Sequence, residues 1–151
     1  MEKRTPFMAH LGAGLEKAEP GYVRMVLKIQ KQHTGYEGVL HGGVLPAVMD
    51  EALGRALASA RGLEAVRESP QVTVDLGVSY LAGAKLGDEV VIEARVLKVG
   101  RTVAFSEATA RKRDDGTLLA SGRATFAILL ADGPPRRSAR RAEPPSETGE
   151  Y

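Results

Sequence analysis

The sequence predicts an α+β domain in which one long helix packs against an antiparallel sheet. One stretch, residues 44–61, repeats its apolar residues with helical spacing, and five other stretches alternate apolar and polar residues as half-buried strands do. The helical stretch follows the first strand, and the other four strands come after it. Elements segregated in this way are typical of an antiparallel sheet that carries its helix on one face.

The first predicted strand covers residues 21–29, GYVRMVLKI. Its even-numbered side chains, from Tyr22 to Lys28, lie on one face, and its odd-numbered ones, from Val23 to Ile29, form an apolar face. This alternation predicts a strand with one face in the core.

The long helix is predicted over residues 44–61, VLPAVMDEALGRALASAR. Its apolar residues recur at i, i+4 and i+8, and Pro46 is tolerated because it falls in the first turn. A second row carries small residues and one carboxylate: Ala47, Asp50, Gly54 and Ala58. Another backbone can approach this row closely, so we expect it either to rest on the sheet or to form a subunit contact that includes a carboxylate.

After a polar loop at residues 61–70, a meander of four strands is predicted at 72–81, 89–99, 102–113 and 117–130. The last two are joined by Asp114-Asp115-Gly116, a sequence typical of a tight hairpin turn. One helix cannot cover a sheet of five strands, so we expect a second copy of the chain to complete the burial.

Composition and charge exclude several classes of protein. The 151 residues include no cysteine, which excludes a disulfide framework, thiol catalysis and cysteine-based metal sites. The 21 Lys and Arg nearly balance 19 Asp and Glu, and four arginines lie among acids in the last 20 residues, so no nucleic-acid partner is expected. No apolar run reaches the ~18 residues of a membrane span, and the N-terminus lacks the apolar run of a signal peptide. We therefore expect a soluble cytoplasmic protein with no membrane partner.

The domain is expected to span residues 1–131. Almost no large apolar residue follows Ala131, so residues 132–151 are predicted to form a flexible tail rich in Pro, Arg and Glu. The three histidines, His10, His33 and His41, are not spaced as a ligand set, and no metal is expected.

The residues best suited to chemistry lie at and after the start of the helix. His41-Gly42-Gly43 precede it, so their backbone N–H groups are among the unpaired donors at its N-terminus, where the glycines let another group come close. Such donors suit the oxyanion that forms during acyl transfer. Asp50 lies nine residues after His41, where a carboxylate could serve as a general base or a nucleophile, or could be a surface acid. Glu51 is instead expected to form a surface ion pair with Arg55.

These residues carry a resemblance to a known family. Gly38-Val39-Leu40-His41-Gly42-Gly43 followed by Asp50 resembles the hotdog-fold acyl-CoA thioesterases of the PaaI-like, phenylacetate-pathway group, within the 4-hydroxybenzoyl-CoA thioesterase superfamily. The resemblance covers about residues 10–130 and includes Lys85-Leu86-Gly87-Asp88 and Gly100-Arg101-Thr102. It implies a hydrolase that acts on an aryl- or medium-chain acyl-CoA thioester and needs no cofactor. It also implies a hotdog fold, with one long central helix wrapped by a five- to six-stranded antiparallel sheet, in a homodimer that pairs into a homotetramer.

The resemblance further assigns roles at a site between two subunits. It implies that the Gly42 N–H binds the thioester carbonyl and that His41 helps to hold the site. Asp50 of the partner subunit would be the base or nucleophile, and Thr73 would orient water or that acid. Coenzyme A is expected to contact residues of the later strands: Tyr80, Lys85, Lys98, Gly100, Arg101 and Thr102. The cations among them could equally be ordinary exposed residues at strand ends.

One position departs from the family pattern. Gly35 stands six residues before His41, where many relatives carry Asn, whose support of the carbonyl or the water is missing unless Gln32, His33 or Thr34 supplies it. The main alternative is therefore a non-catalytic acyl-CoA-binding protein of the same fold. A ligand-sensing transcription factor would need a DNA-binding helical module, for which the roughly 20 residues before the first strand leave little room. A hotdog dehydratase would be expected to use a catalytic histidine.

Overall fold

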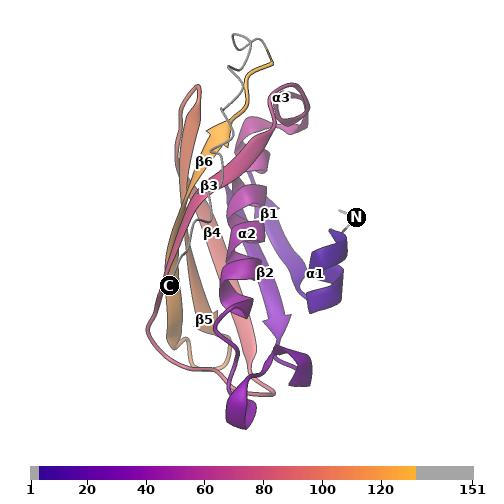
Figure 1. The fold of residues 1–151 in the computed structure, drawn as a ribbon, viewed down its shortest axis with the longest axis vertical. Helices are drawn as coiled ribbons and strands as arrows, with labels where there is room; N and C mark the ends of the chain where they lie inside the picture. The colour runs from indigo at the N-terminus through magenta and orange to yellow at the C-terminus, as the bar shows by residue number, and fades with distance from the viewer. Residues whose placement is uncertain (1–3, 132–151) are drawn as a thin grey trace, which may run out of the picture.

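The computed structural model describes residues 4–131, so the predicted tail at 132–151 lies outside the described residues. The long helix matches its prediction over 44–61, and each of the five predicted strands is present with ends shifted by two residues at most. Two short 3₁₀ turns, Lys31–His33 and Tyr36–Gly38, connect the first predicted strand to the long helix. The full order is α1 (Pro6–Leu11), β1 (Gly14–Glu19), β2 (Tyr22–Lys28), α2 (Val44–Arg61), α3 (Leu63–Glu68), β3 (Gln71–Tyr80), β4 (Glu89–Val99), β5 (Val103–Lys112) and β6 (Leu118–Ile128) (Figure 1).

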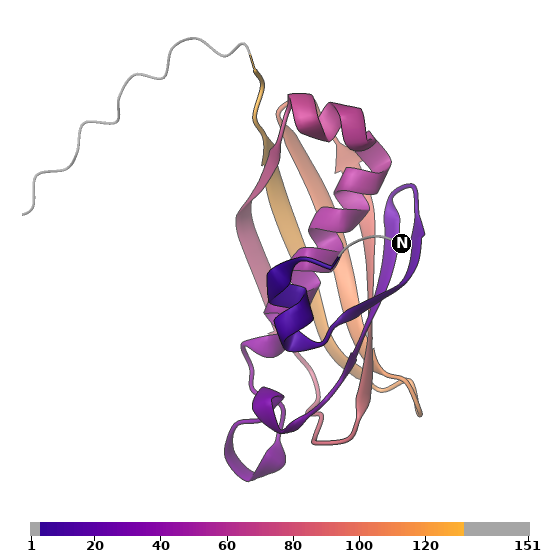
Figure 2. The ribbon, with the colours of Figure 1, turned by 90° about the vertical axis from the view of Figure 1, so that its right-hand side faces the viewer.

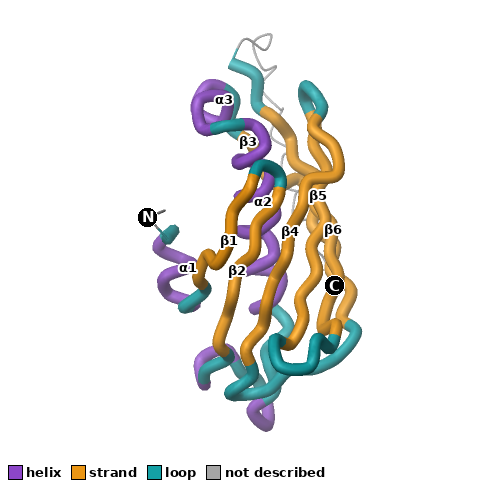
Figure 3. The backbone as a smooth tube through the Cα atoms, turned by 180° about the vertical axis from the view of Figure 1, so that it is seen from behind, coloured by secondary structure: helices purple, strands orange, loops and turns teal. Residues whose placement is uncertain are grey.

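The strands form one six-stranded antiparallel sheet in the order β1-β2-β4-β5-β6-β3. Figure 3 shows β1, β2, β4, β5 and β6 side by side in this order. The α+β class is confirmed, but the prediction that β3 to β6 form a meander is wrong for β3. That strand pairs with β6 at one edge, while β4 pairs with β2. Alternation of apolar residues identifies a strand and its buried face without identifying its neighbour. Because β3 is the last strand in this order, its outer edge has no partner strand within residues 4–131.

Three elements are absent from the sequence prediction, namely α1, β1 and α3, and α3 occupies most of the stretch predicted as a loop. Each buries little. β1 is an edge strand whose last four residues are exposed, α1 buries only Met8, and α3 has no buried residue. Elements that bury so few side chains leave little apolar periodicity in a sequence.

Helix α2 lies along one face of the sheet, and the core is formed between them (Figure 2). Its buried side chains are Leu45, Val48, Met49, Ala52, Leu53, Ala56 and Leu57. Strands β5 and β6 present mainly small residues to it, and at Gly122 an added Cβ would lie 2.9 Å from Cε of Met49 and 3.1 Å from the Gly77 carbonyl oxygen. Small residues in the sheet therefore let the helix pack closely against it. None of the helices in residues 4–131 is long and apolar enough to cross a membrane.

Candidate active site

The start of α2 presents an unpaired backbone donor at Gly42. The helix begins at Val44, with Gly43 as its N-cap residue. The Gly43 N–H donates to Nδ1 of His41 at 2.9 Å, and the Gly42 carbonyl accepts a hydrogen bond from the Tyr80 hydroxyl. The Gly42 N–H meets no acceptor within residues 4–131 and is exposed, so it can donate to an oxygen of a bound molecule.

Backbone hydrogen bonds fix the segment that leads into α2. The Leu40 N–H donates to the Ala84 carbonyl and the His41 N–H donates to the His33 carbonyl, both at 2.8 Å. These bonds connect the segment to the loop after β3 and to the 3₁₀ turn after β2. The glycines at the helix start are thus anchored from two sides, although both are exposed.

Asp50 faces the edge strand β3 and bonds to it. The Thr73 hydroxyl donates to Oδ1 of Asp50 at 2.8 Å, so the structure brings together the acid and the hydroxyl residue that the sequence analysis paired. The row of small residues on α2 lies beside them, and the Gln71 side chain donates to the Gly54 carbonyl at 2.7 Å. This part of α2 therefore lies beside the edge strand, beneath a shallow surface hollow of about 250 Å³.

A bulge in β3 puts Thr73 on the helix side of the sheet. Its pairing with β6 shifts by one residue between Thr73 and Asp75. Leu76 and Val78 pack on the core, so in a regular strand Thr73 would face the opposite side. The extra residue reverses the alternation, and both sets of side chains face α2.

The Glu51–Arg55 ion pair is present on the turn next to Asp50, with 2.6 Å between the carboxylate oxygen and Nε. The side chains are 20% and 14% exposed, respectively, so the prediction of a surface pair is only partly right. Both line the hollow that contains Asp50 and Thr73, because α2 turns this side toward the start of β3. One negative and one positive side chain, both largely covered by the protein, therefore lie beside the Asp50 carboxylate.

The two parts of the candidate site do not meet within one chain. Gly42 precedes α2 and Asp50 is eight residues further on, which corresponds to about 12 Å at ~1.5 Å per residue. A single thioester carbonyl cannot contact both groups at that separation, since hydrogen bonds span about 3 Å.

Comparisons with known proteins show the family to which this chain belongs. The family model for the thioesterase superfamily matches residues 37–119, and acyl-coenzyme A thioesterase 13 from Homo sapiens is 38% identical over 126 residues, covering 83% of this chain and 86% of the human protein. This chain belongs to the thioesterase superfamily. The predicted hotdog fold and the enzyme class, a thioester hydrolase, are thereby confirmed.

Two solved structures share the thioesterase fold. Thioesterase superfamily member 2 from Mus musculus is 34% identical, with a TM-score of 0.71 over 80% of this chain and 86% of the mouse chain. The phenylacetic acid degradation protein PaaI from Thermus thermophilus is 26% identical, with a TM-score of 0.74 over 83% of this chain and 100% of that one. The resemblance to the PaaI-like group therefore extends over most of the domain.

The residues predicted to bind coenzyme A lie at two ends of the thioesterase sheet. Tyr80 and Lys85 lie near the start of α2, since Tyr80 bonds to Gly42 and Lys85 pairs with Val39. The turn that contains Gly100, Arg101 and Thr102 lies at the opposite end, with Lys98 just before it. There the Thr102 carbonyl accepts from Ile128, the residue paired with the start of β3. One chain thus does not gather the six residues into one surface, and the second group lies at the end of the sheet nearer Asp50.

Two of these predicted contacts have structural roles in the thioesterase. An added Cβ at Gly100 would lie 2.7 Å from the Val103 carbonyl oxygen, so glycine is needed for the tight turn between β4 and β5. The Lys85 N–H donates to Asp88 at 3.0 Å, and this bond, with the nearby Lys112 ammonium, holds the pKa of the Asp88 carboxyl below its usual value. Lys98, Arg101 and Thr102 are exposed.

No neighbour of Gly35 supplies the amide that many relatives carry there. The buried His33 accepts from the Gln30 N–H and contacts the Leu11 carbonyl through Nε2 at 2.7 Å, which makes it a structural residue. Gln32 donates to Gln30 and the Thr34 hydroxyl donates to Lys31. All three side chains bond within their own loop or to the end of α1.

Sequence reasoning missed the surroundings of Gly42. A hollow of about 320 Å³ lies beside it, lined by Leu40, His41, Leu45, Tyr80 and the small residues of 82–84. The hydroxyl of Tyr80 contacts the glycine loop here, whereas the sequence analysis assigned Tyr80 to coenzyme A. Tyr80 shares its face of β3 with Leu76 and Val78, but alternation does not tell which part of the chain that face meets at the end of the strand.

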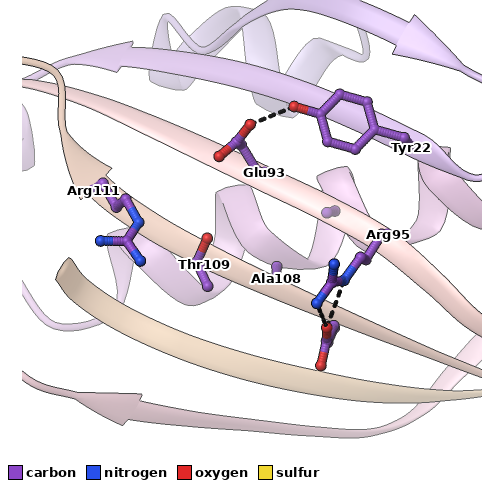
Figure 4. Close-up of a pocket in the computed structure, with 8 residues that line it drawn as sticks. Tyr22, Glu93, Arg95, Ala108, Thr109 and Arg111 are labelled. Carbon is purple, nitrogen blue, oxygen red and sulfur yellow. Dashed lines mark hydrogen bonds and ion pairs between the residues drawn. The ribbon is translucent and has the colours of Figure 1, made fainter. Parts of the chain in front are cut away.

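A third hollow, of about 290 Å³, lies on the face of the sheet away from α2 and contains none of the predicted site residues. Figure 4 shows two pairs among its side chains: Tyr22 bonds to Glu93, and Arg95 pairs with a carboxylate of β5, Glu107. Within residues 4–131, no group of three or more His, Asp or Glu could hold a metal ion.

Proposed function

We propose that this thioesterase hydrolyses an aryl- or medium-chain acyl-CoA to the free acid and coenzyme A, at a site shared by two subunits of a homodimer. The observation that carries the proposal is the separation of about 12 Å between two groups: the Gly42 N–H just before α2, which has no acceptor within residues 4–131, and Asp50 on α2, which bonds to Thr73. The human relative is named as an acyl-coenzyme A thioesterase, which supports this substrate class. Pairing into a homotetramer and a cytoplasmic location stay predictions.

The edge of β3 supports a two-fold dimer. Within the described part of the chain this strand has one unpaired edge, and its Val72 and Val74 are 42% and 60% exposed. An exposed edge of this kind favours pairing with another strand. If two copies of β3 pair antiparallel about a two-fold axis, the Tyr80 end of one strand lies beside the Gln71 end of the other. Gly42 then comes close to Asp50 of the partner subunit, and the two halves of the site are joined.

In the proposed reaction the Gly42 N–H donates to the thioester carbonyl oxygen and stabilises the charge that develops there. Asp50 takes a proton from water as the water oxygen bonds to the carbonyl carbon, while Thr73 holds the carboxylate in place. The carbon–sulfur bond then breaks, and the thiolate of coenzyme A takes up the proton that Asp50 accepted. Direct attack by Asp50 on the carbonyl carbon would instead expel the thiolate of coenzyme A and form a mixed anhydride, which water then cleaves to the free acid and the Asp50 carboxylate, with a water proton going to the thiolate.

The same two-fold axis would bring together the two groups of coenzyme A contacts. Lys85 lies at the Gly42 end, and Lys98 and Arg101 lie at the Asp50 end, so cations from both subunits would flank one site. Cationic side chains at such a site suit the phosphates of coenzyme A. The hollow beside Gly42, lined partly by Leu40 and Leu45, suits an apolar acyl group.

A binding protein without activity is the second candidate, and Gly35 favours it. The amide present in many relatives is absent, and Gln32, His33 and Thr34 bond elsewhere. Such a protein would bind acyl-CoA in a calorimeter and release no thiol.

The experiment is a panel of aryl and medium-chain acyl-CoA esters, read by thiol release, with the wild type, Asp50→Asn and Asp114→Asn. Asp114 lies in the β5–β6 turn and bonds only to its own loop, so its variant controls for the loss of a carboxylate. We expect Asp50→Asn to lower turnover at least ~100-fold, which is the lower end of the range that general acid–base catalysis contributes. Asp114→Asn should leave turnover within twofold of the wild type. Equal turnover of the wild type and Asp50→Asn would contradict the assignment of Asp50.

A further inference from the structure

The peptide that joins Gly42 to Gly43 is held at both of its polar atoms by side chains. Its carbonyl oxygen accepts from the Tyr80 hydroxyl, and its N–H donates to Nδ1 of His41 at 2.9 Å. Tyr80 comes from the end of β3 and is 38 residues away from Gly42 in sequence. The two bonds therefore connect the helix start to the edge strand and to the residue that precedes the glycines.

A pair of glycines needs such restraint to place a donor. Glycine reaches a wider range of backbone angles than any other residue. Two glycines in succession therefore leave the N–H of the first one poorly oriented unless other contacts fix the backbone. Nothing within residues 4–131 bonds to the Gly42 N–H itself, and the His41 carbonyl of the same peptide accepts from the Val44 N–H at 3.1 Å. The Gly42 N–H is thus oriented by that bond on one side and by the Gly42–Gly43 peptide on the other. With both polar atoms of the Gly42–Gly43 peptide engaged, rotation between the two peptides is limited.

We propose that Tyr80 and His41 are positioning residues that clamp the Gly42–Gly43 peptide and so aim the Gly42 N–H at the thioester carbonyl. This inference rests on the proposed function for its effect on rate, while the clamp itself can be tested without activity. It replaces the expectation that Tyr80 contacts coenzyme A. It also gives His41 the role of a hydrogen-bond acceptor, since Nδ1 receives the Gly43 N–H.

The first test removes the hydroxyl alone, with Tyr80→Phe. We expect kcat for an acyl-CoA ester to fall about 5- to 10-fold with KM within twofold, less than the ~100-fold cost of deleting an oxyanion donor outright. Tyr22→Phe is the matched control, because it removes another hydrogen-bonded hydroxyl, which donates to Glu93 on the opposite face of the sheet. It should leave kcat and KM within twofold. An unchanged kcat in Tyr80→Phe, or a rise in KM alone, would overturn the role of Tyr80.

The second test concerns His41. An Asn side chain can accept from the N–H two residues further on, which is the bond that His41 makes to Gly43. We expect His41→Ala to lower kcat about 10-fold and His41→Asn to restore at least a third of the wild-type kcat. If His41→Asn is as impaired as His41→Ala, His41 acts through chemistry that Asn lacks, and its role as an acceptor is wrong.

The third test does not depend on turnover. With ¹⁵N-labelled glycine, amide hydrogen exchange of Gly42 and Gly43 can be followed in the wild type, Tyr80→Phe and Tyr22→Phe. We expect slow exchange at Gly43 and fast exchange at Gly42 in the wild type, and at least threefold faster exchange at Gly43 in Tyr80→Phe only. Unchanged exchange at Gly43 in that variant would refute the clamp even if acyl-CoA is hydrolysed. The expected pattern in a protein that releases no thiol would refute the proposed function and leave the clamp standing.

Discussion

Thr73 on the edge strand donates its hydroxyl to Oδ1 of Asp50 on the central helix, at 2.8 Å. The two residues are 23 positions apart in sequence, and the bulge after Thr73 is what turns this hydroxyl toward α2. The bond fixes the carboxylate against β3, one of the two edge strands whose outer edge is unpaired within the described chain. The acid is therefore held at the boundary where a second subunit would dock.

Replacing Thr73 with Val removes the hydroxyl while it keeps the branched shape. We expect kcat to fall about tenfold, which corresponds to ~1.4 kcal/mol of transition-state stabilisation. Thr73→Ser, which restores a hydroxyl, should keep kcat within about threefold. Steady-state thiol release measures both variants, and equal loss in the two would mean that packing, and not the hydrogen bond, is what Thr73 contributes.

The sequence predicted the parts of the fold that bury the most surface. The α2 stripe from Leu45 to Leu57 and the alternation of β4 each mark one buried face, so their ends agree with the structure. The position of β3 was not predictable in the same way, because its pairing with β6 depends on which strand fills the place beside β2. β1 and α3 bury few side chains and leave no comparable pattern.

The parts of the candidate site that lie within one short segment of sequence could be predicted. The glycines before the helix imply free N–H groups at Gly42 whatever the rest of the chain does, and the small-residue row marked Asp50 as unusual. The Tyr80–Gly42 bond could not be predicted, since it joins residues 38 apart and depends on where β3 lies relative to the start of α2, which alternation does not give. The signal that could have found it is the tyrosine at the end of a strand next to the small residues 82–84.

Arg101 lies in the exposed turn between β4 and β5, at the end of the sheet nearer Asp50. We expect Arg101→Ala to raise KM for acyl-CoA about 3- to 10-fold with kcat within twofold, because loss of a phosphate contact weakens binding in the ground state and the transition state equally. The rise should shrink at high salt, since exposed charges are screened. Arg123→Ala, on a strand face away from α2, is the control, and an unchanged KM in Arg101→Ala would remove this residue from the binding site.

Gly122 allows α2 to pack closely against β6. A Cβ there would lie 2.9 Å from Cε of Met49 and 3.1 Å from the Gly77 carbonyl oxygen. We expect Gly122→Ala to lower the free energy of unfolding by about 1–3 kcal/mol, the usual cost of overpacking. At Gly83 an added Cβ meets nothing within 4 Å, so Gly83→Ala serves as the comparison in denaturant unfolding. Equal stability of the two variants would contradict the close packing.

Asp88 links stability to pH. The Lys85 N–H that donates to its carboxylate, together with Lys112, holds the pKa of Asp88 below its usual value in the folded protein. The carboxylate therefore contributes stability at neutral pH, and this contribution is lost as the pH falls below about 4, through the lowered folded pKa. We expect Asp88→Asn to be less stable than the wild type at pH 7 and the difference to shrink toward pH 3. A difference that stays constant over this range in thermal unfolding would contradict the assignment.

The central claim, that each site takes Gly42 from one subunit and Asp50 from the other, is tested most directly by mixing two inactive variants. Asp50→Asn removes the acid, and Gly42→Pro removes the N–H, with circular dichroism to check that each folds. A mixed dimer then has one site with both groups intact and one site with neither. Co-expressed variants should recover about a quarter of the wild-type activity, because half of random dimers are mixed and each has one working site of two. If the co-expressed variants stay as inactive as either variant alone, although mixed dimers form, the site does not combine Gly42 and Asp50 from different subunits.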